Sequence, residues 1–560
     1  MAKIFLIDFS SEILINVAMR LKEKGVEILY WTGRKRFFDQ IVKNKEIFPK
    51  TIFHNNLDAV RAISAEDLRN AEFDPPGKEL INEMLECESL TLTMMTRLDF
   101  RGQVPFLKKK HLYYKYLQYW NGVIGKLKPD MIIFRSTPHA SYNFVLYWLA
   151  KKYSIKTMMF DSTVFMDKLL VLKDFRELPE EFMELIRKSK DNKYQITELP
   201  KDKQEYFEQL ANLKIDATPD YKKQIIAQIN DPVKVFPPIK KIIKNIKSGN
   251  FFPVLRYHIK SALNLTNRPI FTIDETDKAD YHNIYQLKKI RKVMDKYKKE
   301  YKKAEQEVDF KRKYIYFPLH YQPECNTSPV GEHFADQILT VKILSSALPQ
   351  GWIIYVKENT AQWNYRNAQA NSFRYSGYYW ELANIKSVSL VSPDVSSFDL
   401  AAQSQAVATI SGTAGWESLV RGKPVLFFGH PWYQHCEGAL SVGNSNDCRR
   451  AIEKIINGYK PDTQKILNYL IALDKSTIRA SHVEYLERAS GVPREESIKV
   501  ITEAVWRKLT ENEAPSGLRP RYLLPTLRRE QNPSEAENSS RSSVSPTTRK
   551  FSAKGDKIHE

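Results

Sequence analysis

The sequence predicts an α/β fold built from two Rossmann-like domains, each a parallel sheet with helices packed on it. Strand and helix patterns alternate in the first part of the chain, and the same alternation returns after residue 313. The length agrees with more than one domain, because 560 residues exceed what one hydrophobic core usually holds. A hydrophobic content of 42% and an aromatic content of 12% exclude a wholly disordered or fibrous chain.

The first domain is expected over residues 1–175. Residues 3–8 (KIFLID) are a short apolar run typical of a buried strand, and a helix follows over 12–24 and ends at Gly25. A strand over 26–31 completes a strand–helix–strand unit. The pattern returns with a strand at 130–135, a helix at 140–153 and a strand at 156–160.

Residues 176–310 are predicted to form a basic, mainly helical insert or linker. Between residues 232 and 268 there are eight basic residues and no acidic one, interleaved with isoleucine and phenylalanine. A helix over 234–263 with lysines on one face would suit an anionic membrane surface. The alternative is an ordinary amphipathic helix that packs on a domain and leaves its lysines solvated.

The second domain is expected over residues 311–510, and it is followed by a tail at 511–560. The tail is rich in Pro, Ser, Arg and Glu and poor in apolar residues, so we expect it to be disordered. In the domain itself, apolar runs predict strands at 313–319, 352–357, 388–391, 406–410 and 424–428, and helices are expected at 332–348, 397–403 and from 447 to about 509.

The net charge of +20 favours polyanionic partners, which include nucleic acids, phosphorylated substrates and anionic membranes. No nucleic-acid-binding module accompanies the charge, so a nucleic acid is not the expected partner. No apolar run is long enough to span a bilayer, and the N-terminus lacks a signal peptide. We expect a cytoplasmic protein that rests on the inner face of the plasma membrane if 234–263 binds lipid.

The cysteine and histidine spacings predict neither a metal site nor a disulfide scaffold. The four cysteines are widely spaced, and no CxxC pair occurs. The eleven histidines form no HxxxH or HxxE pattern. We therefore expect a protein of a reducing compartment without a bound metal or other cofactor.

The most informative segment is 409–433, TISGTAGWESLVRGKPVLFFGHPWY. A buried strand ends in a turn of small residues that opens a helix. Backbone N–H groups at a helix start, together with the hydroxyls of Ser411 and Thr413, suit a phosphate, and Gly412 permits close approach of the backbone. Glu417, about one turn into the helix, can accept hydrogen bonds from ribose hydroxyls. The alternative is an ordinary helix cap with Glu417 merely exposed.

This segment resembles known nucleotide-sugar sites. The pattern S-G-x-x-x-x-E followed by G-K-P-V-L looks like the site of two-domain (GT-B) glycosyltransferases and of UDP-N-acetylglucosamine epimerases. The longer string is similar to bacterial capsule polysaccharide biosynthesis proteins, which include Kdo transferases. The resemblance implies a GT-B-type arrangement with a cleft between the domains. It also implies that Ser411, Gly412 and Thr413 contact the donor phosphate and that Glu417 holds the ribose.

Other residues of the second domain are candidates by their place at strand ends. The string PLHYQPE after the first strand resembles the first donor-domain loop of these proteins, so Gln322 is a donor-binding candidate. His320 and Glu324 could bind the donor or transfer protons. The alternative is a loop in which Glu324 caps the next helix. Lys357 and His430 complete the predicted donor site.

One departure from the family pattern concerns the second strand of this domain. Capsule proteins usually carry a His-Pro pair there, and its histidine helps to hold the phosphate. Here Asn359-Thr360 stands in that place, so Lys357 is the residue that can supply positive charge. His430 belongs to a separate, later His-Pro pair, for which a plain loop-forming role is equally open.

In the first domain, Asp8, Arg135, His139 and Asp161 all lie at or just beyond predicted strand ends. In two-domain glycosyltransferases this edge holds the acceptor and the base or nucleophile. We take Asp161 as the preferred carboxylate and Asp8 as the second. For each one, helix capping or a salt bridge is the alternative.

Together these features predict a glycosyltransferase that moves a sugar from a nucleotide-sugar donor to a capsular polysaccharide or a lipid-linked glycan. CMP-Kdo is the donor that the resemblance suggests, and a metal-independent reaction is expected. Two alternatives stay open at this point: a nucleotide-sugar epimerase on the same fold, and a non-catalytic protein of surface-polysaccharide assembly.

Overall fold

The computed structural model describes residues 1–43, 45–96, 99, 104–212, 284–363 and 373–511. The chain divides into two units, Met1–Ser516 and Gly517–Glu560, and the second lies wholly outside the described residues. The predicted helix over 234–263 and the predicted tail from residue 512 onward also lie outside them. Two sheets are described, both in the first unit.

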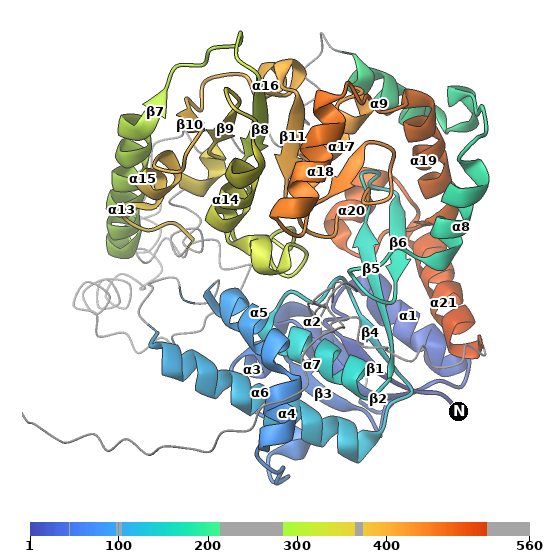
Figure 1. Cartoon of the computed structure of the whole chain (residues 1–560). Helices are drawn as coiled ribbons and strands as arrows, with labels where there is room; N and C mark the ends of the chain where they lie inside the picture. Colours follow the sequence, from blue (N-terminus) through green and yellow to red (C-terminus); the bar gives the residue numbers. More distant parts are fainter. Residues whose placement is uncertain (44, 97–98, 100–103, 213–283, 364–372, 512–560) are drawn as a thin grey trace, which may run out of the picture. The chain divides into compact units, whose positions relative to one another are not determined.

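The first sheet has seven described strands in the order β14-β6-β5-β4-β1-β2-β3 (Figure 1). The strands from β3 to β5 pair in parallel, β6 runs antiparallel to β5, and β14 runs antiparallel to β6. The strands are β1 (Lys3–Ile7), β2 (Glu27–Gly33), β3 (Ile52–Asn55), β4 (Met131–Phe134), β5 (Lys156–Ser162), β6 (Lys168–Leu172) and β14 (Ile478–Arg479).

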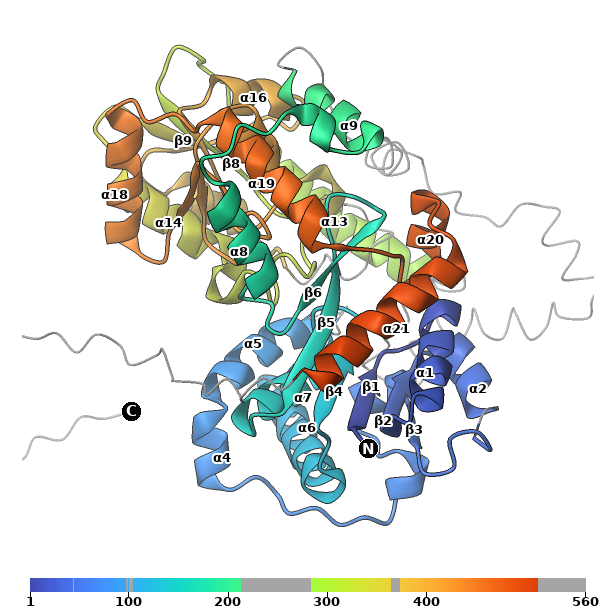
Figure 2. The same ribbon diagram turned by 90° about the vertical axis from the view of Figure 1, so that its right-hand side faces the viewer.

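Alternation along β1 assigns its side chains to the two faces of this sheet. Ile4 and Leu6 belong to a core cluster with α1 and α21, and Figure 2 shows these two helices side by side. Phe5 and Ile7 belong to a cluster that includes α5, α6 and α7. The helices of this domain are α1 (Glu12–Glu23), α2 (Lys35–Val42), α3 (Asn56–Val60), α4 (Lys78–Glu83), α5 (Leu85–Thr96), α6 (Phe106–Leu127), α7 (Ser141–Lys152) and α21 (Arg494–Thr510).

The second sheet also has seven described strands, all paired in parallel, in the order β13-β12-β11-β8-β9-β10-β7. They are β7 (Glu305–Gln306), β8 (Tyr314–Pro318), β9 (Ile353–Lys357), β10 (Val388–Val391), β11 (Ala406–Thr409), β12 (Val425–Phe427) and β13 (Ala439–Ser441). The predicted α/β fold with two mainly parallel sheets is therefore confirmed.

The helices that accompany the second sheet include three that precede it in the chain, α8, α9 and α13. α8 packs on α19, and α9 packs on α17. The helices are α8 (Glu180–Ser189), α9 (Lys201–Ala211), α13 (Ile284–Ala304), α14 (Gln337–Ala347), α15 (Tyr378–Ala383), α16 (Ser397–Gln403), α17 (Thr413–Val420), α18 (Ser445–Ile456) and α19 (Thr463–Ser476). A further helix, α20 (Glu484–Ser490), lies in the chain between β14 and α21 and contacts α21 through the ion pair of Glu487 with Arg494.

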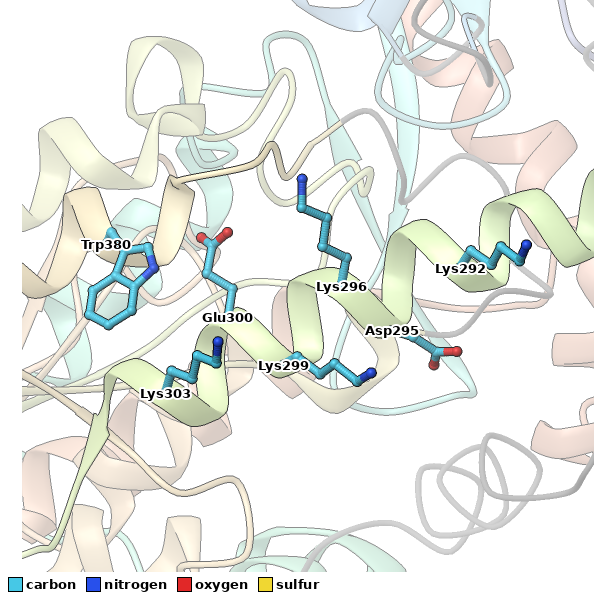
Figure 3. Close-up of a pocket in the computed structure, with 7 residues that line it drawn as sticks. All are labelled: Lys292, Asp295, Lys296, Lys299, Glu300, Lys303 and Trp380. Atoms are coloured by element: carbon cyan, nitrogen blue, oxygen red, sulfur yellow. The ribbon is translucent and has the colours of Figure 1, made fainter.

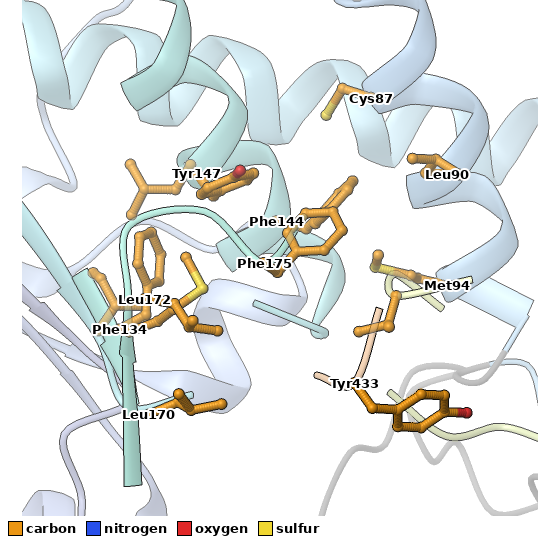
Figure 4. Packing of buried hydrophobic residues seen from close by; sticks show 14 of the residues in the cluster. Cys87, Leu90, Met94, Phe134, Phe144, Tyr147, Leu170, Leu172, Phe175 and Tyr433 are labelled. Atoms are coloured by element: carbon orange, nitrogen blue, oxygen red, sulfur yellow. The ribbon is translucent and has the colours of Figure 1, made fainter. Parts of the chain in front are cut away.

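Aromatic side chains fill much of the larger core cluster, part of which is drawn in Figure 4. Tyr147 of α7 packs against Phe134 of β4, Phe144 and Phe175, with ring centroids 5.7–6.2 Å apart. Each buried aromatic ring removes a large apolar area from water. This packing holds the end of β4 and the start of α7 in place.

The domain boundaries differ from those predicted at residues 310 and 510. β7 belongs to the second sheet and begins before residue 311, whereas β14 and α21 belong to the first sheet domain. The reason lies in α21, whose buried Ile498, Ile501 and Val505 form an apolar face that covers α1. An amphipathic pattern shows that a helix packs, but not on which domain.

None of the described helices combines the length and the apolar composition that crossing a bilayer requires.

Candidate functional site

Three parallel strands of the second sheet bring the predicted donor-site residues to one edge. β8, β9 and β11 are neighbours, and their C-terminal ends are followed by His320, by the loop after Lys357 and by the turn Ser411–Thr413. In open parallel sheets, ligands bind at this edge. The structure therefore gathers residues that lie nearly one hundred positions apart in the sequence.

The turn after β11 is held by the Thr409 hydroxyl and by Tyr433. The Gly412 N–H donates to Thr409 Oγ1 over 3.1 Å, and the Tyr433 hydroxyl donates to the Gly412 carbonyl over 2.6 Å. A Cβ on Gly412 would lie 2.8 Å from His320 Nε2. This position therefore needs glycine because the histidine ring lies against the backbone. The N-cap of α17 is Gly412, which has no side chain with which to cap the helix.

Ser411 has an internal role in this turn. Its hydroxyl donates to the Asn326 carbonyl over 2.6 Å, and the residue is 7% exposed. The side chain thereby ties the turn after β11 to the loop after β8. Thr413, in contrast, is exposed at the start of α17. At this turn the backbone and Thr413, rather than the Ser411 hydroxyl, are placed to meet an anion.

Ser397 links Lys357 to Tyr316, because it accepts a hydrogen bond from Lys357 and is hydrogen-bonded to Tyr316. The Lys357 ammonium donates to the Ser397 hydroxyl over 2.9 Å and to the Val395 carbonyl, and burial lowers the pKa of Lys357 to about 8. Burial, and then the Glu417 carboxylate, raise the pKa of Tyr316. Lys357 thus reaches Tyr316 of β8 through Ser397, and the charge of Glu417 acts on the same tyrosine.

His320 is held as a neutral imidazole. The backbone N–H of His320 donates to Gln337 Oε1 over 2.7 Å, and the ring Nε2 lies 3.1 Å from Thr409 Oγ1. Burial, and then the Arg374 guanidinium, lower the pKa of His320 to about 4. Nδ1 is buried and has no hydrogen-bond partner within the described part of the chain. A neutral ring can donate or accept one hydrogen bond at a ligand but supplies no charge.

A buried polar network behind His320 includes Gln322, which the sequence offered as a donor-binding residue. Gln322 is 3% exposed, and its side chain donates to the Ala335 carbonyl over 2.8 Å. Its Oε1 accepts from Gln337 over 2.8 Å and from Arg374 over 2.9 Å. All of these partners are internal, so the structure makes Gln322 a residue that shapes the loop.

The centre of this network is an ion pair that sequence reasoning missed. Arg374 Nε lies 2.7 Å from Glu358 Oε2, and the two side chains are 1% and 0% exposed. The Tyr379 hydroxyl also donates to Glu358 Oε2 over 2.6 Å, and the Arg374 guanidinium lies over the Tyr378 ring. The pair fixes the loop after β9, which contains Asn359 and Thr360, and the Asn359 N–H donates to Glu358 Oε1 over 2.8 Å.

Glu324 lies in the loop after β8, and His430 lies in the loop after β12. Glu324 is exposed, and its backbone carbonyl accepts hydrogen bonds from Thr327 and Ser328 in the following turn. His430 Nε2 lies 3.2 Å from Glu332 Oε2, and Arg176 Nε lies 2.5 Å from Glu332 Oε1. Glu332 is a second functional candidate that the sequence did not single out.

Glu332 should make the stability of the fold depend on pH. Burial alone would raise its pKa, but His430 and Arg176 outweigh burial and lower the pKa to about 2 from the ordinary 4.5. A depressed pKa stabilises the fold above pH 4.5, and this stabilisation, up to about 3 kcal/mol, is lost as the pH falls toward 2. Unfolding free energies of Glu332→Gln should therefore lie below those of the unmodified protein above pH 4.5 and converge with them near pH 2. Equal separation at both ends would contradict this account.

The first sheet presents its own set of polar side chains at its C-terminal edge. Asp8 follows β1 and pairs with Arg34 and Arg135, which lower its pKa against the effect of burial. Asp161, at the end of β5, accepts hydrogen bonds from the Thr137 N–H over 2.9 Å and from its hydroxyl over 2.6 Å. Burial raises the pKa of Asp161. Of the two carboxylates, Asp161 is thus the better proton acceptor.

Two hollows lie outside these strand ends. One, of about 510 Å³, runs along α13 and is lined by Lys292, Lys296, Lys299 and Lys303 together with Asp295, Glu300 and Trp380 (Figure 3). The other, of about 550 Å³, includes residues 164–168 after β5, residues of α9 and Arg479. Neither is lined by a residue that the sequence predicted for the site. Among the described residues, no three His, Cys, Asp or Glu side chains come together as a metal site would need.

Comparison with known proteins identifies one family. Residues 281–443 match the family described as capsule polysaccharide biosynthesis protein. The predicted resemblance is confirmed for this segment, which holds the ends of β8, β9 and β11 and all of α17. No curated protein matches the chain.

Several solved structures are similar to this chain. UDP-GlcNAc 2-epimerase from Methanocaldococcus jannaschii is 12% identical, with 85% of this chain and 100% of that chain covered and a TM-score of 0.22. KpsC of Thermosulfurimonas dismutans, described as a beta Kdo 2,7 transferase, is 10% identical, with 85% and 99% covered and a TM-score of 0.27. A beta Kdo 2,4 transferase structure of the same KpsC is 11% identical, with 61% and 79% covered and a TM-score of 0.27. TM-scores this low transfer no function to this chain.

Proposed function

We propose that this protein is a glycosyltransferase that moves a sugar from a nucleotide-sugar donor to a capsular or lipid-linked glycan. One observation carries the proposal: the segment that matches the capsule family places the start of helix α17, with Gly412 as its N-cap, at the C-terminal edge of a parallel sheet. A helix start at such an edge favours an anion because its N–H groups and its dipole point at the ligand.

The donor would be held by groups from three loops. The backbone at Gly412 and Thr413 would meet the phosphate, and Lys357 would add positive charge beside it. Glu417 would accept hydrogen bonds from the ribose. His320 would donate or accept one hydrogen bond as a neutral ring, since its pKa is about 4. The donor nucleotide, for which CMP is the first choice, is part of the proposal.

The acceptor hydroxyl would be activated by Asp161 of the first domain. The carboxylate would take the hydroxyl proton while the hydroxyl oxygen bonds to the anomeric carbon of the donor sugar. The bond from that carbon to the nucleotide phosphate would break, and its electron pair would leave with the nucleotide. The two Thr137 hydrogen bonds would keep the carboxylate oriented. We expect no metal ion to be required.

The proposal is tested by incubating the full chain with a panel of nucleotide sugars, with and without a lipid-linked glycan. A transferase releases nucleotide only when the acceptor is present. An epimerase alters the donor sugar without any acceptor. A non-catalytic assembly protein does neither, and that outcome would overturn the proposal.

Replacing Glu417 by Ala is expected to remove the stabilisation of the fold by the donor nucleotide. A ligand that binds only the native state raises the unfolding free energy by about 2.7 kcal/mol at one hundred times its dissociation constant. Thermal melts with CMP, UDP and GDP measure this effect and identify the nucleotide. Glu453→Ala on α18 is the control, because Glu453 is an exposed glutamate on another helix of this domain. Equal nucleotide stabilisation in both variants would place the site elsewhere.

A further inference from the structure

A row of lysines lies along one face of α13 and lines the hollow of about 510 Å³, which we call the lysine trough (Figure 3). The lysines are spaced three or four positions apart, so they share one face of the helix, and all of them are exposed. From the first to the last, the row spans about 16 Å along the helix axis, a length that several linked sugars cover. The residues of the row are Lys292, Lys296, Lys299 and Lys303.

The carboxylates in the lysine trough do not neutralise these lysines. None of the four ammonium groups forms an ion pair or a hydrogen bond with a described residue. Glu300 instead accepts hydrogen bonds from the backbone N–H groups of Gly377 and Tyr379 over 2.9–3.1 Å. Asp295 lies 3.8 Å from Arg291 of the same helix. Both carboxylates are therefore engaged elsewhere, and the lysines meet solvent as unpaired cations.

An exposed aromatic ring lines the same hollow. Trp380 of α15 is 44% exposed, and its indole N–H has no hydrogen-bond partner in the part of the chain that the structure describes. Figure 3 shows the ring at the end of the row that holds Glu300 and Lys303, opposite Lys292. The flat face of an indole can pack on the C–H face of a sugar ring while its N–H donates to a hydroxyl. The trough thus combines cations with a surface for a sugar ring.

The apolar face of α13 is used inside the domain. Met294, Tyr301 and Ala304 are 1–5% exposed. The Tyr301 hydroxyl donates to the Val391 carbonyl over 2.6 Å and accepts from the Glu358 N–H over 3.1 Å. These contacts fix the helix beside the loop after β9. They also leave no apolar face for insertion into a bilayer, which membrane-bound amphipathic helices need.

We propose that the lysine trough binds the acidic glycan that this protein extends, a linear polysaccharide with carboxylate or phosphate groups along its chain. The inference rests on the proposed function, because it takes a growing polysaccharide as the substrate. The whole of α13 and Trp380 lie within residues 281–443, which match the capsule polysaccharide family. The lysines would meet the acidic groups of successive sugars, and Trp380 would stack on one ring. The trough would hold the finished part of the chain, while its reacting end stays at the strand ends.

Two other polyanions are the alternatives. An anionic membrane would attract the same lysines, and a single-stranded nucleic acid would also stack a base on Trp380. The buried apolar face of α13 and the hollow shape of the trough count against a membrane. The match to a polysaccharide family favours a glycan over a nucleic acid.

The test is calorimetric titration of the full chain at one fixed salt concentration, since salt screens exposed charges. The ligands are polygalacturonate, phosphomannan, neutral dextran, single-stranded oligothymidylate, and vesicles of equal parts phosphatidylglycerol and phosphatidylcholine. We expect at least one of the two acidic glycans to bind at least about tenfold more tightly than dextran and the other ligands. Comparison of the two acidic glycans shows whether the trough prefers a carboxylate or a phosphate.

Variants locate the binding in the trough. Lys296→Gln combined with Lys299→Gln should weaken acidic-glycan binding about tenfold. The matched control combines Lys454→Gln with Lys499→Gln, which removes the same charge from two exposed lysines on α18 and α21. Trp380→Ala should weaken binding several-fold, and Trp380→Phe, which keeps an aromatic face, by less. Thermal melts without ligand check that each variant is folded.

The inference is wrong if neither acidic glycan binds more tightly than dextran, or if the control pair weakens binding as much as the trough pair. Unchanged affinity in Trp380→Ala would overturn it too, because the trough would then be only a charged surface. Tighter binding of vesicles or oligothymidylate through the same lysines would assign the trough to a membrane or a nucleic acid instead.

Nucleotide binding is measured by thermal melts of the same samples, which separates this inference from the proposed function. If a nucleotide stabilises the fold and no acidic glycan binds, this inference fails alone. If an acidic glycan binds and no nucleotide stabilises the fold, the result counts against the proposed transferase and leaves a glycan-binding assembly protein.

Discussion

Replacing Asp161 by Asn is expected to reduce sugar transfer about 10²–10⁴-fold and to leave nucleotide binding unchanged. An amide cannot take the proton of the acceptor hydroxyl. Its oxygen can still accept a hydrogen bond from Thr137, which preserves the local fold. The measurement is nucleotide release with donor and acceptor both present.

The pH dependence offers a second readout of the same residue. Burial raises the pKa of Asp161, and the hydrogen bonds from Thr137 lower it in part. Because the ionised carboxylate is the base, the transfer rate should rise with pH until that raised pKa is passed. Thr137→Val removes the hydroxyl but keeps the carboxylate, so the rising limb should move to higher pH. An Asp161→Asn variant that retains half of the activity or more would show that another group is the base.

Replacing Arg374 by Met is expected to destabilise the fold by about 3–5 kcal/mol. The substitution leaves Glu358 charged, fully buried and without its ionic partner. It also removes the hydrogen bond from Arg374 to Gln322 and so loosens the loop that carries His320. Unfolding in urea, followed by tryptophan fluorescence, measures the loss.

A double variant separates the ion pair from simple packing. Arg374→Met combined with Glu358→Gln removes both charges, so it should be more stable than Arg374→Met alone. The control is an ion pair on the surface of α18, that of Arg450 with Asp447. Because this pair is solvent-exposed at the arginine, Arg450→Met should lower the free energy of unfolding by less than about 1 kcal/mol. A cost below about 1 kcal/mol for Arg374→Met would mean that the pair does not hold the loop.

Local patterns in the sequence predicted most of the framework of the site. The apolar runs at β1, β8, β9 and β11 are buried strands, and the small-residue turn at Gly412 opens a helix as expected. These elements can be predicted because they depend on residues that are close together in the sequence: the apolar periodicity, the glycines and the turn-forming residues. Because parallel strands all point the same way, their C-terminal ends then lie at one edge of the sheet.

The contacts between distant residues could not be predicted in this way. Glu358 pairs with Arg374, but no sequence motif links the two positions. Arg176 pairs with Glu332, which lies 156 positions further along the chain. The partner of α21 was missed for the same reason, since its apolar face fits any covering helix. The roles assigned to Ser411 and Gln322 assumed that polar side chains at strand ends face a ligand. Instead, both side chains bond to neighbouring loops.

The central claim is that the helix start at Gly412 binds the phosphate of a nucleotide. Hydrogen exchange of the full chain, with and without the stabilising nucleotide, tests it most directly because it reports on backbone amides one segment at a time. The account predicts slower exchange over residues 411–417, with smaller effects after β8 and β9. Unchanged exchange there, with protection confined to the lysine-lined hollow along α13, would contradict it.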